Sequence, residues 1–301
     1  MNANDILIVG AGTAGLTAAI YVQRAGRHAV LFEKGAPGGQ IVTANEIQNY
    51  PGYSSINGAD FAYKLYEQAT SLGAEFINGE VLKITPEKDA VTIQTASGTY
   101  TGRALIYAAG ASHRRLGLAN EEKLIGRGIS FCANCDGAFF KGKTVAVNGG
   151  GNTALDDALY LSRVAKEVYL IHRRKEYRAE QPLQKAVAET ANIHPILDTT
   201  ITALHETSGH LAAITLHNLV TQQDTELAVD GLFLAVGMKP ETALLSGIVD
   251  LNEAGYILAG EDTRTSVNNI FAAGDVRNKT VRQLTTAAAD GTAAAIAAVA
   301  L

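Results

Sequence analysis

The chain has 301 residues, of which 47% are hydrophobic and 30 are glycine, and its formal net charge at pH 7 is −5. This length suits about two domains of ordinary size, and the composition is typical of a globular α/β protein, not of a disordered or fibrous one. Because the mild charge is spread along the chain without a long basic run, it argues against non-specific binding to nucleic acid or to a membrane surface.

The most apolar stretch, residues 6–22, has the hydrophobicity of a signal or membrane segment. Glycines interrupt it, however, and residues 1–5 before it carry no positive charge, whereas a secretory signal begins with one. The only cysteines, Cys132 and Cys135, stand three positions apart, which excludes a secreted disulfide framework that joins distant loops. We therefore expect a cytoplasmic protein whose cysteines act locally.

The N-terminal residues have the pattern of a strand–helix–strand unit that binds a dinucleotide. Gly10, Gly12 and Gly15 separate an apolar strand from a helical stretch, and they suit, in that order, a tight turn, a close approach to a pyrophosphate and close helix packing. The helix N-terminus then offers free N–H groups to phosphates. Glu33 ends the second strand, where a carboxylate can accept hydrogen bonds from ribose hydroxyls. The expected elements are strands at 6–9 and 29–32 and a helix that ends near residue 24.

The same pattern recurs at a constant offset, with Gly149, Gly151 and Ala154 in the places of the first three glycines. Strands are expected at 144–147 and 168–171, with a helical stretch at 155–162 between them. The repetition indicates two related nucleotide-binding units in one chain.

The second unit differs from the first in the charge that follows its second strand. His172, Arg173 and Arg174 stand where the first unit has its acid, and Arg178 follows nearby. Guanidinium groups match the charge and the planar geometry of a phosphate, whereas a carboxylate repels it. The second unit is therefore predicted to prefer NADPH over NADH, and a solvated basic cluster is the alternative.

The cysteine pair lies just before the second unit, in a segment without strong strand or helix periodicity. A CxxC pair can close a small disulfide ring and exchange thiols near neutral pH. A zinc site is disfavoured because no second CxxC or CxxH supplies the other ligands. A thioredoxin fold is disfavoured by the position between two nucleotide units and by the absence of tryptophan. A dithiol that exchanges electrons with a flavin remains. Asp136, next to Cys135, is either an acid–base group or a plain turn residue.

Together these motifs resemble the low-molecular-weight, bacterial-type NADPH-dependent thioredoxin reductases, and the resemblance covers almost the whole chain. Further segments that match the family's pattern are Gly38-Gly39-Gln40, Asn49-Tyr50-Pro51-Gly52, Ala108-Ala109-Gly110, Gly237-Met238-Lys239-Pro240, Gly274-Asp275 and Arg282-Gln283. The resemblance implies an α/β fold with two Rossmann-like dinucleotide-binding domains. A split FAD domain would comprise residues 1–112 and 243–301, and an inserted NADPH domain with the CxxC pair would comprise residues 113–242. It also implies a homodimer.

The resemblance also implies the roles of individual residues. Cys135 would be the thiol nearest the flavin, Cys132 would attack the disulfide of thioredoxin, and Asp136 would be the acid or base. The residues implied for FAD are Gly10, Gly12, Thr13, Ala14, Gly15, Glu33, Lys34, Gly39, Gln40, Asn49, Val81, Ala109, Gly110, Gly274, Asp275, Arg282, Gln283 and Leu284. Those implied for NADPH are Gly151, Asn152, Thr153, Ala154, His172, Arg173, Arg174 and Arg178. Contacts to thioredoxin are expected from Arg127, Phe139 and Phe140, although such residues are more often solvated or in the core.

The expected reaction passes a hydride from NADPH to FAD, and then electrons to the cysteine disulfide and on to thioredoxin. The inserted domain would rotate between these half-reactions about hinges near residues 112 and 243. Three alternatives remain open. They are a flavin disulfide reductase that serves another thiol carrier or a peroxidase component, a relative that takes electrons from ferredoxin, and a non-catalytic redox sensor. Asn148 and the pair Asp156-Asp157 depart from the family's usual pattern.

Overall fold

The computed structural model describes residues 6–44 and 46–301, and the chain divides into two compact units. The first unit ends at Ser112 and resumes at Lys239, and the second runs from His113 to Met238. The two connecting segments, β8 (Ala111–His113) and β17 (Met238–Pro240), pair as a two-stranded sheet. Residues 1–5, whose lack of positive charge argues against a secretory signal, lie outside the part of the chain that the structure describes.

The first unit is built on a five-stranded parallel sheet in the order β18-β7-β1-β2-β3. Its strands are β1 (Ile6–Val9), β2 (Ala29–Glu33), β3 (Glu75–Asn78), β7 (Ala104–Tyr107) and β18 (Ile270–Ala272). Because both faces of a parallel sheet are covered, its central strands read as continuous apolar runs, and every residue of β1, β7 and β18 is buried.

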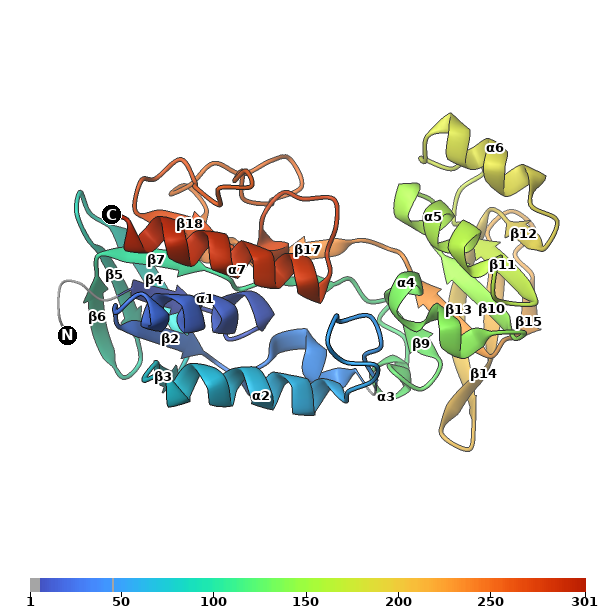
Figure 1. Cartoon of the computed structure of the whole chain (residues 1–301). Helices are drawn as coiled ribbons and strands as arrows, with labels where there is room; N and C mark the ends of the chain where they lie inside the picture. Colours follow the sequence, from blue (N-terminus) through green and yellow to red (C-terminus); the bar gives the residue numbers. More distant parts are fainter. Residues whose placement is uncertain (1–5, 45) are drawn as a thin grey trace. The chain divides into compact units, whose positions relative to one another are not determined.

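Different layers cover the two faces of this sheet. Helices α1 (Thr13–Arg24) and α7 (Leu284–Val299) lie side by side over one face, with α2 (Gly58–Ser71) next to α1 (Figure 1). Side chains of β1 alternate between the faces, so Ile6 and Ile8 join the core under α1, whereas Leu7 and Val9 join the core on the other side. That second core includes residues of an antiparallel sheet of β4 (Val81–Pro86), β5 (Val91–Thr95) and β6 (Gly98–Gly102).

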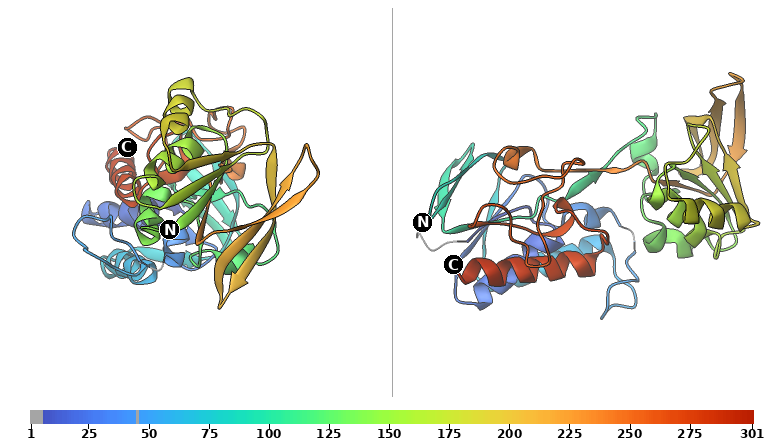
Figure 2. Two further views of the ribbon diagram at one scale, coloured as in Figure 1. Left: turned by 90° about the vertical axis from the view of Figure 1, so that its right-hand side faces the viewer. Right: turned by 90° about the horizontal axis from the view of Figure 1, so that it is seen from above.

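The second unit repeats the plan with a parallel sheet in the order β12-β11-β10-β16-β9. Its strands are β9 (Ile129–Ser130), β10 (Thr144–Asn148), β11 (Glu167–Ile171), β12 (Ile193–Ile196) and β16 (Gly231–Leu234). Its helices are α3 (Glu121–Leu124), α4 (Ala133–Asp136), α5 (Asn152–Leu161) and α6 (Gln181–Glu189). An antiparallel sheet of β13 (Thr199–Thr207), β14 (His210–Asn218) and β15 (Asp224–Ala228) completes the unit, and Figure 2 shows its long hairpin.

The predicted α/β fold with two Rossmann-like sheets is confirmed. Two details differ from the expectation. Helix α5 begins at Asn152 because Gly151 is its N-cap, and the CxxC segment forms the four-residue helix α4, which is too short to show a helical period. Within the described residues, no helix combines the length and the apolar character that crossing a bilayer requires.

Candidate active site

The glycine-rich turn after β1 lies at the point of the first sheet where the strand order reverses. Such sheets bind ligands beyond the carboxyl ends of the strands at this point. Gly10 has a φ of +97°, and a Cβ there would lie 2.4 Å from the carbonyl oxygen of Ala108. A Cβ at Gly15 would lie 1.8 Å from the carbonyl oxygen of Gly10. At Gly12, the N-cap of α1, the nearest atom to a Cβ would be 3.9 Å away. Gly10 and Gly15 are therefore required because a side chain at either position would clash, whereas the main chain at Gly12 is open to a ligand.

Glu33, at the end of β2, holds the glycine-rich turn in place. Its Oε2 accepts a hydrogen bond from the N–H of Ala11 at 2.9 Å, and its Oε1 accepts one from the N–H of Gly35 at 3.0 Å. The Glu33 carboxylate, which is predicted to bind a ribose, thus also links the glycine-rich turn at Ala11 to the loop at Gly35. Lys34 is exposed, and its Nζ lies 3.8 Å from Glu80. Exposed pairs of this kind contribute little to stability.

Other predicted segments gather at the same carboxyl edge. Ala109 and Gly110 follow β7, and Gly274 and Asp275 follow β18. Next to the turn, the N–H of Gly38 donates to the carbonyl of Ala11 at 2.7 Å. This contact brings the short helix η1 (Gly39–Thr43), which carries Gln40, to the glycine-rich turn, and the Gln40 side chain donates to the carbonyl of Ala111.

Two segments far apart in sequence meet at the start of α7. The Nδ2 of Asn49 donates to Oε1 of Gln283 at 3.4 Å across 234 positions of sequence. Gln283 is the N-cap of α7, and Leu284 is the first residue of that helix. The guanidinium of Arg282 lies 4.5 Å from the centre of the Tyr256 ring.

Buried polar atoms at this edge point to a ligand. Among residues 6–44 and 46–301, neither Oδ1 of Asp275 nor Nε of Arg282 has a hydrogen-bond partner, although both atoms are buried. Burial raises the pKa of the Asp275 carboxyl above its ordinary range. Since buried polar groups are costly without a partner, these two side chains suit a polar molecule that enters the edge of the sheet.

The turn after β10 has the same open geometry in the second unit. Gly151 is the N-cap of α5, and a Cβ there would meet no atom of the described chain within 4 Å. The loop after β11 returns to this turn, because the N–H of Arg178 donates to the carbonyl of Gly150 at 2.7 Å. This hydrogen bond fixes the loop of exposed arginines, which includes Arg173 and Arg174, beside the open helix N-terminus.

His172 lies under the arginines with its ring against Gly150, where a Cβ would be 2.3 Å from the ring. It is 5% exposed, and its Nε2 has no partner in the described part of the chain. Burial lowers the pKa of His172, a hydrogen bond with the backbone of Glu176 opposes that shift, and the charges of Arg178, Arg174 and Arg173 lower the pKa further. The ring is therefore neutral near pH 7 and offers one free nitrogen.

Sequence reasoning missed Tyr177, whose ring centre lies 5.5 Å from that of His172. Its buried hydroxyl also lacks a partner within the described residues. The neighbouring Asn152 side chain exchanges hydrogen bonds with Glu180, at 3.0 Å from Nδ2 and at 2.9 Å to Oδ1. Of the predicted turn residues, Thr153 is exposed, whereas Ala154 is fully buried in the core.

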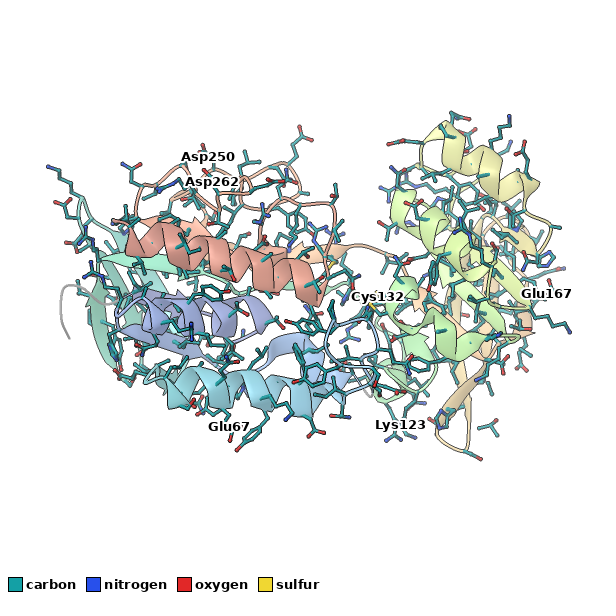
Figure 3. All side chains as sticks on the ribbon, in the orientation of Figure 1. Glu67, Lys123, Cys132, Glu167, Asp250 and Asp262 are labelled. Atoms are coloured by element: carbon teal, nitrogen blue, oxygen red, sulfur yellow. A yellow bond between two sulfur atoms is a disulfide. The ribbon has the colours of Figure 1, made fainter. Side chains whose placement is uncertain are left out.

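Cys132 and Cys135 form a disulfide at the start of α4, and Cys132 is labelled in Figure 3. Cys135 is exposed and Cys132 is half-buried. Ser130, which sequence reasoning missed, links Asp136 to this segment. Its Oγ donates to Oδ2 of Asp136 at 2.6 Å and accepts from the N–H of Cys132 at 3.1 Å. Burial raises the pKa of Asp136, and the hydrogen bond from Ser130 opposes that rise.

A second carboxyl supports the dithiol segment from α5. Asp157 is 9% exposed and accepts a hydrogen bond from the N–H of Ala133, which lies between the cysteines. Burial, and then the charge of Asp156, raise the pKa of Asp157 to about 7. Helix α5 therefore carries the open glycine turn at its N-terminus and contacts the dithiol segment further along.

The sequence profile of the pyridine nucleotide-disulphide oxidoreductases matches residues 4–291 of this chain. The chain belongs to this family. The thioredoxin reductase of Bacillus subtilis is 40% identical over 291 residues, 97% of this chain and 92% of that protein. The thioredoxin reductase of Listeria innocua is 42% identical over 287 residues, 95% of this chain and 90% of that protein. The crystal structure of thioredoxin reductase from Streptococcus pyogenes superposes with a TM-score of 0.93 at 38% identity and covers 98% of this chain and 97% of that one.

The predicted resemblance to bacterial-type thioredoxin reductases, which are pyridine nucleotide-disulphide oxidoreductases, is confirmed. Two of the residues predicted from it, Val81 and Phe140, pack in the cores of the units. Val81 is 7% exposed and packs in the core of the first unit. Phe140 packs against Phe233 with ring centres 5.2 Å apart, whereas Phe139 is exposed. Of these two aromatic residues, only Phe139 offers its ring to a partner.

We expect Asp157→Asn to stabilise this oxidoreductase above pH 7 and to have little effect near pH 4. The folded-state pKa of about 7 lies above the ordinary value of 3.8, so the unfolded chain releases its proton first. The wild type therefore loses stability as the pH rises from about 4 to about 7, by a few kcal/mol at most, since one pKa unit corresponds to about 1.36 kcal/mol. Asparagine keeps an acceptor for the N–H of Ala133 but cannot ionise.

Thermal unfolding of both proteins between pH 4 and pH 8 measures this effect. The matched control is Asp156→Asn, which removes the neighbouring, more exposed carboxyl and should have a smaller effect. A difference in unfolding temperature between Asp157→Asn and wild type that does not change with pH would contradict the assignment.

Proposed function

We propose that the chain is an NADPH-dependent thioredoxin-disulfide reductase, with FAD in the unit built on β1 and NADPH in the unit built on β10. One observation carries the proposal. The Cys132–Cys135 disulfide lies in the same compact unit as a glycine turn flanked by three arginines. A dithiol in the same unit as a site suited to a 2′-phosphate supports an enzyme in which NADPH repeatedly supplies the electrons that reduce the disulfide. The relatives named thioredoxin reductase support thioredoxin as the acceptor.

The residues at the first sheet's edge fit FAD. The open main chain at Gly12 and the N-terminus of α1 suit the pyrophosphate, and Glu33 suits a ribose. The buried, unpaired carboxyl oxygen of Asp275 suits a hydroxyl group of the ribityl chain. Asn49 and the Arg282-Gln283 segment are assigned to the flavin side.

The residues at the second edge fit NADPH. Gly151 and the N-terminus of α5 suit the pyrophosphate, because the main chain there is open. The guanidinium groups of Arg173, Arg174 and Arg178 suit the 2′-phosphate. The charge of a bound phosphate would also offset the mutual repulsion of the three arginines around the neutral His172.

Held by the residues at the first edge, FAD would supply the two-electron chemistry that links oxidation of NADPH to reduction of a disulfide. Reduction of the Cys132–Cys135 disulfide takes two electrons and two protons and leaves two thiols. The Cys132 thiolate then attacks one sulfur of the thioredoxin disulfide, and Cys135 displaces reduced thioredoxin and restores the ring. Asp136 is assigned to give and take the proton at these thiols, and Ser130 orients its carboxyl.

The proposal retains the rotation of residues 113–242 between half-reactions, about hinges near residues 112 and 243, which the resemblance implies. A homodimer and a cytoplasmic location are part of it for the same reason.

The test is NADPH-dependent reduction of a disulfide reporter by the purified yellow protein, with and without oxidised thioredoxin. We expect rapid reduction of the reporter only when thioredoxin is present. Equal reduction without thioredoxin, or faster reduction with a glutaredoxin-like protein or a peroxidase component in its place, would redirect the proposal to another acceptor.

A further inference from the structure

Asp290 of α7 is the centre of a buried cluster of charges in the first unit. Its Oδ2 accepts hydrogen bonds from the N–H of Gly274 at 3.0 Å, from Nε of Arg277 at 2.9 Å and from Nζ of Lys279 at 2.8 Å. Its Oδ1 accepts one from Nη2 of Arg277 at 2.8 Å. Asp290 is 6% exposed and Arg277 is 8% exposed. Because buried charges are costly unless they are fully paired, this saturated cluster differs from an ordinary surface ion pair.

All four donors belong to one segment, residues 274–279, that follows β18. Arg277 also donates through Nη1 to the carbonyls of Ala259 at 3.0 Å and Gly260 at 2.8 Å. The same side chain therefore ties the segment to the loop on which Asp262 is labelled in Figure 3. Gly274 has a φ of +77°, a conformation that few other residues adopt. Asp290 thus determines the path of the main chain that carries Asp275.

Asp275 accepts no hydrogen bond from Arg277 or Lys279 within the described residues. Its buried Oδ1 lacks a partner within the part of the chain that the structure describes. Both cations are instead bonded to Asp290, and the hydrogen bonds from them hold the pKa of Asp290 below its ordinary range although burial alone would raise it. The arrangement keeps one carboxylate saturated and leaves the other free for a ligand.

Gly291, the residue after Asp290, allows α7 to pack closely on α1. A Cβ at Gly291 would lie 2.2 Å from the carbonyl oxygen of Ala14, so α7 packs directly on the first turn of α1. A Cβ at Gly274 would lie 3.0 Å from Cβ of Ala14. Asp290 and Gly291 together therefore hold residues 274–275 against the open helix N-terminus that follows Gly12.

We propose that Asp290, through Arg277 and Lys279, is a positioning residue for the dinucleotide of the first unit, because it holds Asp275 at a fixed distance from the N-terminus of α1. This inference rests on the proposed function for the identity of the ligand, FAD. Asp290 itself is hydrogen-bonded on both oxygens by protein donors, so it acts through the segment and does not bind the cofactor.

Loss of the Asp290 charge would also redirect Asp275. Arg277 and Lys279 would then be buried cations without a carboxylate, and the charge of Lys279 already acts on Asp275. We expect these cations to recruit the Asp275 carboxyl in Asp290→Asn. The ligand would lose a charge-assisted hydrogen bond even though Asp275 is still present.

The experiment measures FAD binding to apoprotein by fluorescence titration for wild type, Asp290→Asn and Ile93→Ala. We expect Asp290→Asn to raise the FAD dissociation constant about 10- to 100-fold, the scale of one charge-assisted hydrogen bond. NADP⁺ binding to the second unit should not change. Ile93→Ala is the control, because it removes a buried side chain of β5 in the same unit and should lower thermal stability to a similar extent as Asp290→Asn. It should bind FAD within about two-fold of wild type, since β5 adds no group to the edge.

Wild-type affinity in Asp290→Asn, or an equal loss of affinity in Ile93→Ala, would overturn the positioning role. If Asp290→Asn does not fold, Lys279→Met is used in its place. It should weaken FAD binding less, about 3- to 10-fold, because Arg277 still holds the Asp290 carboxylate through two hydrogen bonds. Unchanged binding in that variant would equally overturn the role. Failure of the wild type itself to bind FAD would instead overturn the proposed function.

Discussion

Cys132→Ser is expected to lower NADPH-dependent reduction of thioredoxin at least about 1,000-fold, the scale observed when a covalent nucleophile is removed. The thiolate is the attacking species in disulfide exchange, and a serine hydroxyl does not ionise near neutral pH. The change removes one sulfur atom at a half-buried position whose main chain is held by Ser130, so the fold should be retained. Thioredoxin reduction and flavin absorbance are measured on the same sample.

The matched control is Asn134→Ala, an exposed change within the same turn, and it should retain most of the activity. Flavin content should equal that of wild type in both variants, because the cysteines and the proposed FAD residues belong to different compact units. Thioredoxin reduction by Cys132→Ser within tenfold of wild type would exclude the dithiol as the route to the acceptor.

Replacement of Arg173 and Arg174 by glutamine is expected to raise the KM for NADPH about 100-fold or more, since a hydrogen bond to a charged group contributes about 1.5–3 kcal/mol. The KM for NADH should stay within about two-fold, because NADH has no 2′-phosphate for these groups to bind. The loop is fixed to the glycine turn through Gly150, so the loss is specific to that end of the nucleotide. Steady-state kinetics with both nucleotides measure it.

Lys185→Gln is the control for overall charge, since it removes an exposed cation from α6 in the same unit. It should leave both KM values unchanged. The KM for NADPH should also rise with ionic strength in wild type and much less in the double variant, because salt screens exposed charges. Parallel increases for NADPH and NADH would contradict a 2′-phosphate site.

Helix α5 contacts the dithiol segment and also carries the proposed nucleotide site at its N-terminus. Its N-terminus is assigned to NADPH, and its Asp157 holds the N–H of Ala133. Gly137, at the end of the dithiol segment, also packs on α5, where a Cβ would lie 2.8 Å from the Tyr160 ring. The dithiol segment therefore rests on the same helix whose N-terminus is proposed to bind the nucleotide.

The two strand–helix–strand units were predictable from sequence because their signals are local. A short, mainly apolar strand, a glycine turn and a helical stretch specify β1–α1–β2 and β10–α5–β11 over short segments of sequence. The steric demand at Gly10, which excludes any Cβ, acts within the same turn that the spacing indicated. The two cysteines were likewise close enough in sequence to predict a small disulfide ring.

Only the tertiary structure decided which distant groups act together. The pairing of Asn49 with Gln283, the cluster around Asp290 and the support of Ala133 by Asp157 each depend on how separate elements pack. Packing of that kind leaves no periodic pattern along the chain, so Ser130 and Asp290 gave no sequence signal, and the sequence did not distinguish Phe140, which packs on Phe233, from the exposed Phe139. Sequence by itself determined the motifs and their chemistry, and the parallel pairing of the strands decided which side chains meet at the carboxyl edges of the sheets.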